Sequence, residues 1–93
     1  MKYRVREGLV LDHVCGEYLL IATRMARPYC PYITKMNKDS VFVWKMLEKE
    51  MPLKQMLQKT AETYQIPEEA ASGILLPFIQ DVLKKGYIVE LEQ

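Results

Sequence analysis

Residues 32–47, YITKMNKDSVFVWKML, contain the point at which the hydrophobic pattern of the chain changes its period. Tyr32 to Met36 is a short run rich in β-forming residues, which predicts a strand. From Lys38 to about Glu50 the period becomes helical, and Asn37 at the junction is a favourable N-cap. The apolar residues that share a face of this helix are Val43, Trp44, Leu47 and Met51. The stretch therefore predicts a strand that leads directly into a helix.

Upstream of this junction, residues 8–23 have the pattern of a β-hairpin. An alternating run is followed by Gly16-Glu17 as the turn and by the apolar run Tyr18 to Ala22. The next segment, Arg24 to Pro31, contains two prolines and predicts a loop. Because Pro31 cannot donate a backbone hydrogen bond, we expect the strand that follows it to lie at a sheet edge.

Downstream, two more helices are expected. Pro52 opens the second, whose apolar residues keep the i, i+3, i+4 spacing as far as Tyr64. The third runs from Glu68 to Lys85, with acidic residues in its first turn, basic residues in its last turn and Gly86 just beyond it. A short terminal strand is predicted over Tyr87 to Leu91.

Pro77 lies inside the third helix, where it removes one backbone hydrogen bond and presses on the carbonyl of Gly73. We expect one kinked helix, with Gly73 giving room for the bend. The resulting order of elements is β-β-β-α-α-α. It predicts an α+β fold in which a three-stranded antiparallel sheet precedes three helices, the last two joined as a helix-turn-helix.

The composition is that of one folded domain, because 49% of the 93 residues are hydrophobic and 27% are charged. The net charge of +1 lacks the basic excess of a dedicated nucleic-acid binder. No apolar stretch has the length of a signal peptide or a membrane span. We therefore expect a cytoplasmic domain covering residues 1–93, with neither nucleic acid nor a membrane as its partner.

Residue types that carry out catalysis or bind metals are few. His13, Cys15 and Cys30 supply three soft ligands, whereas a structural zinc site needs four in close pairs. Nucleophile-elbow, P-loop and dinucleotide motifs are absent from the sequence. We expect a chain that is not an enzyme, with no catalytic residue, metal or cofactor, and with both thiols reduced.

The helix-turn-helix makes a winged-helix DNA-binding transcriptional regulator the alternative function. In such proteins the second helix of the motif enters the major groove and is flanked by phosphate-binding Lys and Arg. Here that helix has three acidic residues, two lysines and no arginine, and its first turn is acidic. Only seven residues follow Gly86, too few for a hairpin wing. These features disfavour the alternative.

The third helix has two apolar stripes. Core packing is expected of the first stripe, which consists of Ala71, Leu75, Ile79, Val82 and Leu83. The second stripe lies about a quarter-turn away and consists of Ile74, Phe78, Asp81 and Lys85. Because this stripe has both apolar and charged residues, it suits contact either with a sheet edge of the same domain or with a peptide laid in a groove. For Phe78, burial in the core is the competing interpretation.

The expected edge strand, Tyr32 to Met36, offers backbone N–H and C=O groups that an extended peptide can pair with. Candidate peptide-binding residues on this strand are Tyr32, Ile33, Thr34 and Lys35. Lys35 near Asp81 would let the groove bind both signs of charge. Alternatively, Thr34 and Lys35 only protect the edge from aggregation. A homodimer paired through the same edge is a third function to consider.

Several of these stretches, taken in order and over nearly the whole chain from about Tyr3 to Glu90, resemble the PqqD-like family. The matching stretches are Glu7-Gly-Leu-Val-Leu11, Gly16-Glu-Tyr18, Tyr32-Ile-Thr-Lys-Met-Asn37, Val41-Phe-Val-Trp44 with Leu47, Tyr64-Gln-Ile66, Phe78 and Lys84-Lys-Gly-Tyr-Ile88. Met36 stands where the family favours Leu, and Pro77 is unusual for it.

The resemblance implies a winged-helix-like domain that acts as a RiPP recognition element, a peptide chaperone of natural-product biosynthesis. Such domains bind the leader of a ribosomally made precursor peptide and present it to a modifying enzyme, often a radical SAM protein. In the family the leader adds as a strand to the third strand and packs on the third helix. By resemblance, the groove of this chain lies at Tyr32 to Lys35 and at Ile74, Phe78 and Asp81.

Overall fold

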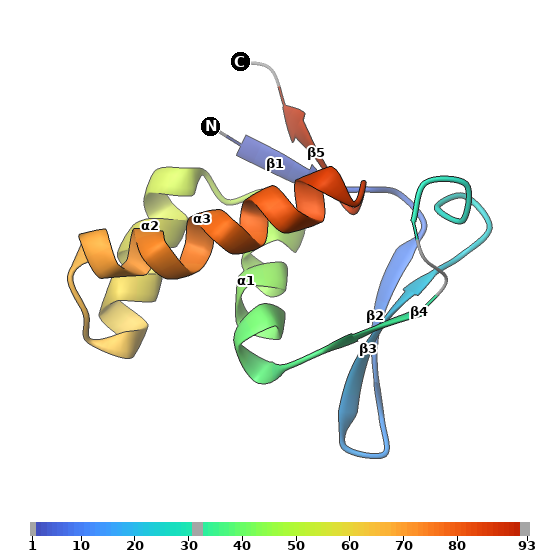
Figure 1. The fold of residues 1–93 in the computed structure, drawn as a ribbon, viewed down its shortest axis with the longest axis horizontal. Helices are drawn as coiled ribbons and strands as arrows, with labels where there is room; N and C mark the ends of the chain where they lie inside the picture. The colour runs from blue at the N-terminus through green and yellow to red at the C-terminus, as the bar shows by residue number, and fades with distance from the viewer. Residues whose placement is uncertain (1, 31–32, 92–93) are drawn as a thin grey trace.

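The computed structural model describes residues 2–30 and 33–91 of the chain. Its elements, in chain order, are β1 (Lys2–Val5), β2 (Leu9–Val14), β3 (Glu17–Ala22), β4 (Ile33–Met36), α1 (Lys38–Glu48), α2 (Leu53–Tyr64), α3 (Glu68–Lys84) and β5 (Ile88–Leu91). The three helices pack together, and the hairpin of β2 and β3 projects away from them (Figure 1). This is the expected α+β fold, with an additional strand at the N-terminus.

Strands β2 and β3 form the predicted antiparallel hairpin, in a register that runs from Leu9 opposite Ala22 to Val14 opposite Glu17. The turn differs from the prediction by one residue. Its two central residues are Cys15 and Gly16, with φ angles of 51° and 78°, whereas Glu17 already belongs to β3. Two positive φ angles define a type I′ turn, whose twist matches that of the strands it connects.

The three-stranded sheet has the order β2-β3-β4, so β4 lies at its edge, as predicted. β4 leads directly into α1, and the Asn37 side chain accepts a hydrogen bond of 2.8 Å from the Ser40 backbone N–H. The predicted N-cap is therefore confirmed. The capped junction sets the direction of β4 relative to α1.

A two-stranded ribbon of β1 and β5 joins the two ends of the described chain, with Lys2 opposite Leu91 and Val5 opposite Ile88. The sequence pattern predicts β5 but not β1. The ribbon has a buried side, where Tyr3 and Ile88 are only 5% and 2% exposed. The first and last described residues, Lys2 and Leu91, therefore lie at the same side of the molecule (Figure 1).

The α3 helix is continuous across Pro77, as predicted, and it packs against α2. Four of the five residues in its expected core stripe are buried: Ala71, Leu75, Ile79 and Val82. The fifth, Leu83, is 37% exposed, so its assignment to the core is wrong. It is adjacent in sequence to Val82, and one helical step of about 100° carries it out of the contact.

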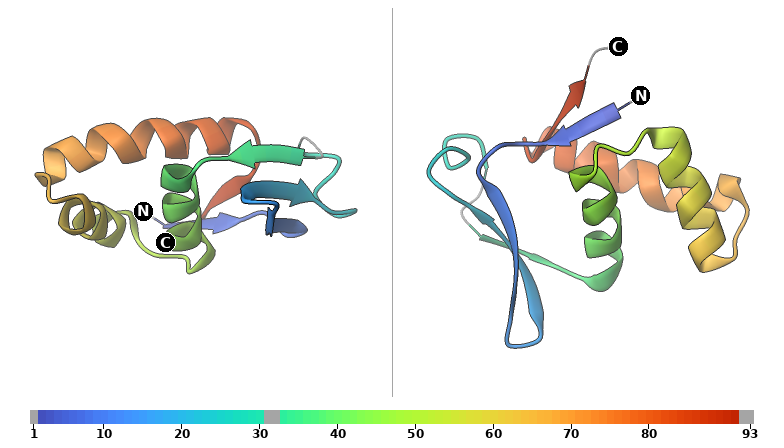
Figure 2. Two further views of the ribbon diagram at one scale, coloured as in Figure 1. Left: turned by 90° about the horizontal axis from the view of Figure 1, so that it is seen from below. Right: turned by 180° about the vertical axis from the view of Figure 1, so that it is seen from behind.

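Trp44 on α1 is fully buried, and its ring meets Tyr87 edge to face at 6.4 Å between centroids. Around it, the helices contribute Leu47, Met56 and Leu75, each with no exposed surface, while β3 contributes Leu20. The core thus joins the sheet, the helices and the start of β5. Seen at right angles, the molecule is thin, with extents of 39 × 36 × 19 Å (Figure 2). Within residues 2–30 and 33–91, no helix is long and apolar enough to cross a membrane.

Candidate functional site: a groove between β4 and α3

A groove lies between the edge strand β4 and the helix α3. It consists of two neighbouring hollows of about 150 Å³ each, which share Ser40 and Phe78 in their walls. The first hollow lies between β4 and the C-terminal half of α3. The second lies between the N-terminal end of α1 and the middle of α3, where Ile74 forms part of the wall. We call the two together the β4–α3 groove.

The groove brings together most of the peptide-binding residues predicted from the sequence. The first hollow is lined by Thr34, Lys35, Phe78, Asp81 and Lys85. Phe78 also lines the second hollow, together with Ile74. Ile33, which is 54% exposed on β4, lines neither hollow, and Tyr32 lies outside the described residues.

The floor of the first hollow is apolar and buried. Leu20 of β3 and Val82 of α3, which are 1% and 3% exposed, both contribute to it. Phe78 is half-buried at the boundary between the hollows, whereas Ile74 is 46% exposed. Exposed apolar surface beside a buried floor suits the side chains of a partner that is itself partly apolar.

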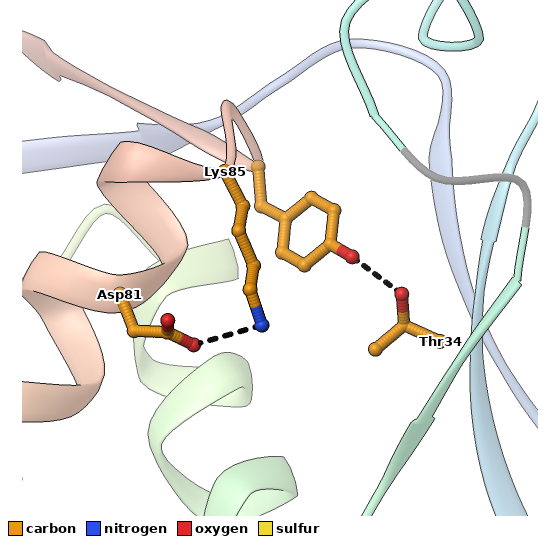
Figure 3. Close-up of polar contacts among 4 residues, drawn as sticks. Thr34, Asp81 and Lys85 are labelled. Atoms are coloured by element: carbon orange, nitrogen blue, oxygen red, sulfur yellow. Dashed lines mark hydrogen bonds and ion pairs between the residues drawn. The ribbon is translucent and has the colours of Figure 1, made fainter.

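The first hollow has polar groups at its rim, and Figure 3 shows two of their contacts. The Thr34 hydroxyl on β4 forms a hydrogen bond with the phenol of Tyr87, which directly precedes β5. On α3, Lys85 Nζ lies 3.2 Å from Asp81 Oδ2. Lys35 is held by Glu17 of β3, with 2.7 Å between Nζ and Oε1. Both signs of charge are therefore present at the groove, although Lys35 pairs with Glu17 rather than with Asp81.

One edge of β4, a strand that lines this groove, has no neighbouring strand among the described residues. Within the described part of the chain, β4 pairs only with β3, through residues Ile33 to Met36. In an antiparallel ladder, every second residue directs its N–H and C=O groups away from the neighbouring strand. β4 thus retains backbone groups that can pair with an added strand.

The rim of the second hollow includes Asp39, in the first turn of α1. The Tyr64 hydroxyl at the end of α2 donates a hydrogen bond of 2.8 Å to Asp39 Oδ1. This bond to the carboxylate raises the pKa of the Tyr64 phenol, with smaller contributions from burial and from the charge of Asp39. Tyr64 also meets Phe42 edge to face at 5.5 Å, which fixes the position of the rim.

Several residues of the groove are not predicted from the sequence, and Tyr87 and Ser40 are two of them. Tyr87 is expected only as the start of a strand, and Ser40 only as part of the first helix. Their sequence positions carry no periodic signal that points to the groove. Only the packing of the helices against the sheet brings Ser40 and Tyr87 next to Phe78.

The three residues considered as metal ligands have other environments. His13 stacks on Tyr18, with ring centroids 4.3 Å apart. Cys15 is exposed in the hairpin turn, whereas Cys30 is buried and its thiol donates to the Gly86 carbonyl at 3.4 Å. Residues 2–30 and 33–91 contain no group of three His, Cys, Asp or Glu side chains suited to a metal ion.

No protein-family model and no curated protein sequence matches the chain. In fold, the chain is similar to TbiB1, whose structure was solved in complex with the TbiA(beta) leader peptide. The TM-score is 0.76, and the match covers 97% of this chain and 99% of that chain at 12% sequence identity. This match confirms the fold implied by the PqqD-like resemblance.

Proposed function

We propose that the chain is a RiPP recognition element: a non-catalytic peptide chaperone that binds the leader of a ribosomally made precursor peptide. The leader adds as a strand to the free edge of β4, and its side chains on one face enter the β4–α3 groove. The residues we assign to peptide binding are Tyr32, Ile33, Thr34, Lys35, Ile74, Phe78, Asp81 and Lys85. The chain acts as one peptide-binding domain and presents the leader to a modifying enzyme.

The observation that carries this proposal is the position of an unpaired strand edge alongside an apolar groove. A strand added to β4 has backbone partners on one side and, on the helix side, the half-buried Phe78 and the exposed Ile74. This is the arrangement that β-strand addition requires, in which backbone pairing gives affinity and side-chain pockets give specificity. The shared fold with TbiB1, a protein solved with a leader peptide, supports the same function.

The expected binding free energy is sufficient for a specific but reversible complex between the chain and the leader. Each backbone hydrogen bond contributes about 1 kcal/mol net, and each leader side chain buried in the groove contributes about 1.5–3 kcal/mol. The ordering of a flexible leader opposes these gains. We expect a Kd in roughly the sub-micromolar to micromolar range, which lets the leader be released after modification.

The modifying enzyme, in this proposal, is a radical SAM protein, as the PqqD-like resemblance implies. The chain itself contributes no chemistry. The role of the groove is to hold the leader in an extended conformation, so that the remainder of the precursor reaches the enzyme at high effective concentration.

The groove is tested by the variant Ile74→Glu, with Leu83→Glu as its matched control. Both residues are exposed leucine or isoleucine side chains on α3, 46% and 37% exposed, but only Ile74 lines the groove. We expect Ile74→Glu to weaken binding of the cognate leader by about tenfold or more, because it replaces an apolar contact worth over 1.4 kcal/mol by an unpaired charge. Leu83→Glu should bind as the wild type does.

Binding is measured by titrating the isotope-labelled chain with the leader peptide encoded next to it and following backbone amide shifts. Shifts that cluster on Thr34, Lys35 and the Ile74–Asp81 segment would support the groove. Equal affinity for both variants would overturn the groove assignment. No shifts at high peptide concentration would overturn the function itself and favour the homodimer or the DNA-binding alternative, which a gel shift at low salt distinguishes.

A further inference from the structure

A separate hollow lies outside the β4–α3 groove. It has a volume of about 320 Å³ and is lined by Arg4, Arg6, Glu7, Met25, Tyr29 and Val89. None of these residues lines the β4–α3 groove, whose wall includes Tyr87 instead. We call this surface the Arg4–Tyr29 face. It is made by the β1–β5 ribbon and by the loop that follows β3.

The loop of the Arg4–Tyr29 face is held in one conformation by its own hydrogen bonds. The backbone N–H groups of Ala26 and Arg27 bond to the Thr23 carbonyl, and those of Tyr29 and Cys30 bond to the Ala26 carbonyl. Ala26 is fully buried, and Cys30 is 8% exposed. The loop is therefore anchored from inside, although Met25 and Tyr29 remain 58% and 60% exposed.

Arg6 is oriented by two contacts. Its Nε donates a hydrogen bond of 2.5 Å to the Gly86 carbonyl, and its guanidinium carbon lies 4.2 Å from the centre of the Tyr29 ring. A guanidinium has five N–H donors in a fixed plane, and the bond to Gly86 uses only Nε. The remaining donors are held in position to meet a carboxylate, with little entropy left to lose.

The charge of the face is predominantly positive. Arg4 lies opposite Val89 in the ribbon and, among the described residues, forms no ion pair. Lys2 is two residues before Arg4, so strand alternation places it on the same side of β1. Glu7 is the only acidic residue in the described lining of the hollow. The positive charge lies beside exposed Met and Tyr side chains, a combination enriched at protein interfaces.

We propose that the Arg4–Tyr29 face is a docking surface for an acidic, partly apolar segment of a second protein. Carboxylates of that segment pair with Arg4 and Arg6, while its apolar side chains cover Met25, Tyr29 and Val89. That the second protein is the enzyme that modifies the leader rests on the proposed function. The preference of the face for an acidic, partly apolar segment does not rest on it. Because the two surfaces share no lining residue, the leader and the acidic segment bind at the same time.

The test uses a synthetic probe: a short, capped peptide of Asp, Glu, Leu and Phe, compared with the same peptide carrying Asn and Gln in place of the acids. Each is titrated into the isotope-labelled full chain at about 50 mM salt, where weak charge pairing is least screened. We expect amide shifts at Arg4, Arg6, Met25 and Tyr29 with the acidic peptide only. Shifts in the β4–α3 groove, or equal shifts with the neutral peptide, would overturn the proposal.

Matched variants distinguish binding at this surface from an effect of net charge and from binding in the β4–α3 groove. Arg4→Glu should weaken binding of the acidic peptide about tenfold, because the new carboxylate repels the ligand. Lys54→Glu makes the same charge change on the exposed surface of α2, and we expect it to change affinity by less than about twofold. Ile74→Glu should leave this binding unchanged.

Three results would count against the docking surface: an equal loss with Lys54→Glu, a loss with Ile74→Glu, or binding of duplex DNA or phosphatidylserine vesicles in place of the peptide. If the leader does not bind but the acidic peptide binds as expected, the proposed function is wrong and the docking surface stands. The opposite pair of results would keep leader binding and remove only the docking surface.

Discussion

Among single residues, Tyr64 and Asp39 form a contact whose strength depends on pH. The Tyr64 hydroxyl donates to the Asp39 carboxylate at the rim of the groove, and this bond raises the pKa of Tyr64 above its ordinary value of 10.0. A raised pKa means that the folded state favours the protonated phenol. The stability from this contact is therefore fully present below the unfolded pKa and is lost as the pH rises through the folded pKa.

We expect the variant Asp39→Asn to lower the pKa of Tyr64 towards 10.0, because the charged acceptor is removed. Tyrosine ring signals followed by NMR from about pH 8 to pH 12 measure this pKa directly. The variant should also lose less stability than the wild type above about pH 10, since it lacks the contact that deprotonation breaks. An unchanged pKa in Asp39→Asn would show that burial, not Asp39, causes the shift.

Thr34 and Tyr87 illustrate a different role for single residues. Their hydrogen bond joins β4 to the start of β5 across the first hollow of the groove. A bond of this kind contributes about 0.5–1.5 kcal/mol net to stability. Both residues line the first hollow, so these two side chains connect the stability of the domain with the shape of its site.

At the scale of elements, α3 has one face buried in the core and another that lines the β4–α3 groove, and Gly73 lies in its N-terminal half. A Cβ atom added at Gly73 would meet nothing within 4 Å outside the backbone of the helix. We expect Gly73→Ala to raise the free energy of unfolding by about 0.5–1 kcal/mol, because alanine loses less backbone entropy in a helix. For a domain of this size the melting temperature should rise by roughly 2–8 °C.

The control is Gly86→Ala, at the end of the same helix. Gly86 has a φ angle of 82°, and an added Cβ would lie 3.0 Å from the Tyr29 carbonyl oxygen. This variant should lose about 1 kcal/mol or more. Thermal unfolding of both variants by circular dichroism makes the comparison. A Gly73→Ala variant less stable than the wild type would mean that the helix needs glycine there to accommodate the Pro77 ring.

The elements also differ in how far the sequence determines them. The α3 helix has acidic residues in its first turn, a basic residue in its last turn and two clear stripes, so Ile74, Phe78, Asp81 and Lys85 are correctly predicted to share a side. β1 has four residues with charges at Lys2 and Arg4, and it is a strand only because β5 pairs with it from the other end of the chain. Such long-range pairing leaves no local signal. The same holds for Tyr87, which reaches the groove through tertiary packing alone.

At the scale of the whole molecule, the free edge of β4 limits what the chain can bind at one time. A leader and a second copy of the chain would use the same backbone groups of Ile33 to Met36. We therefore expect the two to compete. Light scattering at increasing concentration, with and without saturating leader, measures this competition.

Any dimer seen without peptide should convert to a complex of one chain and one leader. The variant Arg4→Glu serves as the control, because its substitution lies outside the groove and should leave this competition unaltered. A dimer that persists with the leader bound would place the contact between the copies on a surface other than β4.

The Gly86–Tyr87 turn and β5 have a consequence for when the protein becomes active during its synthesis. Tyr87 closes one wall of the groove, while the Gly86 carbonyl and Val89 help to build the Arg4–Tyr29 face. These residues leave the ribosome after every other part of both surfaces. A nascent chain that ends at Lys84 has the helices and the hairpin but neither finished surface. If the chain binds a leader peptide as proposed, it therefore offers a complete groove only after residues 86–91 have been made and folded back onto β1.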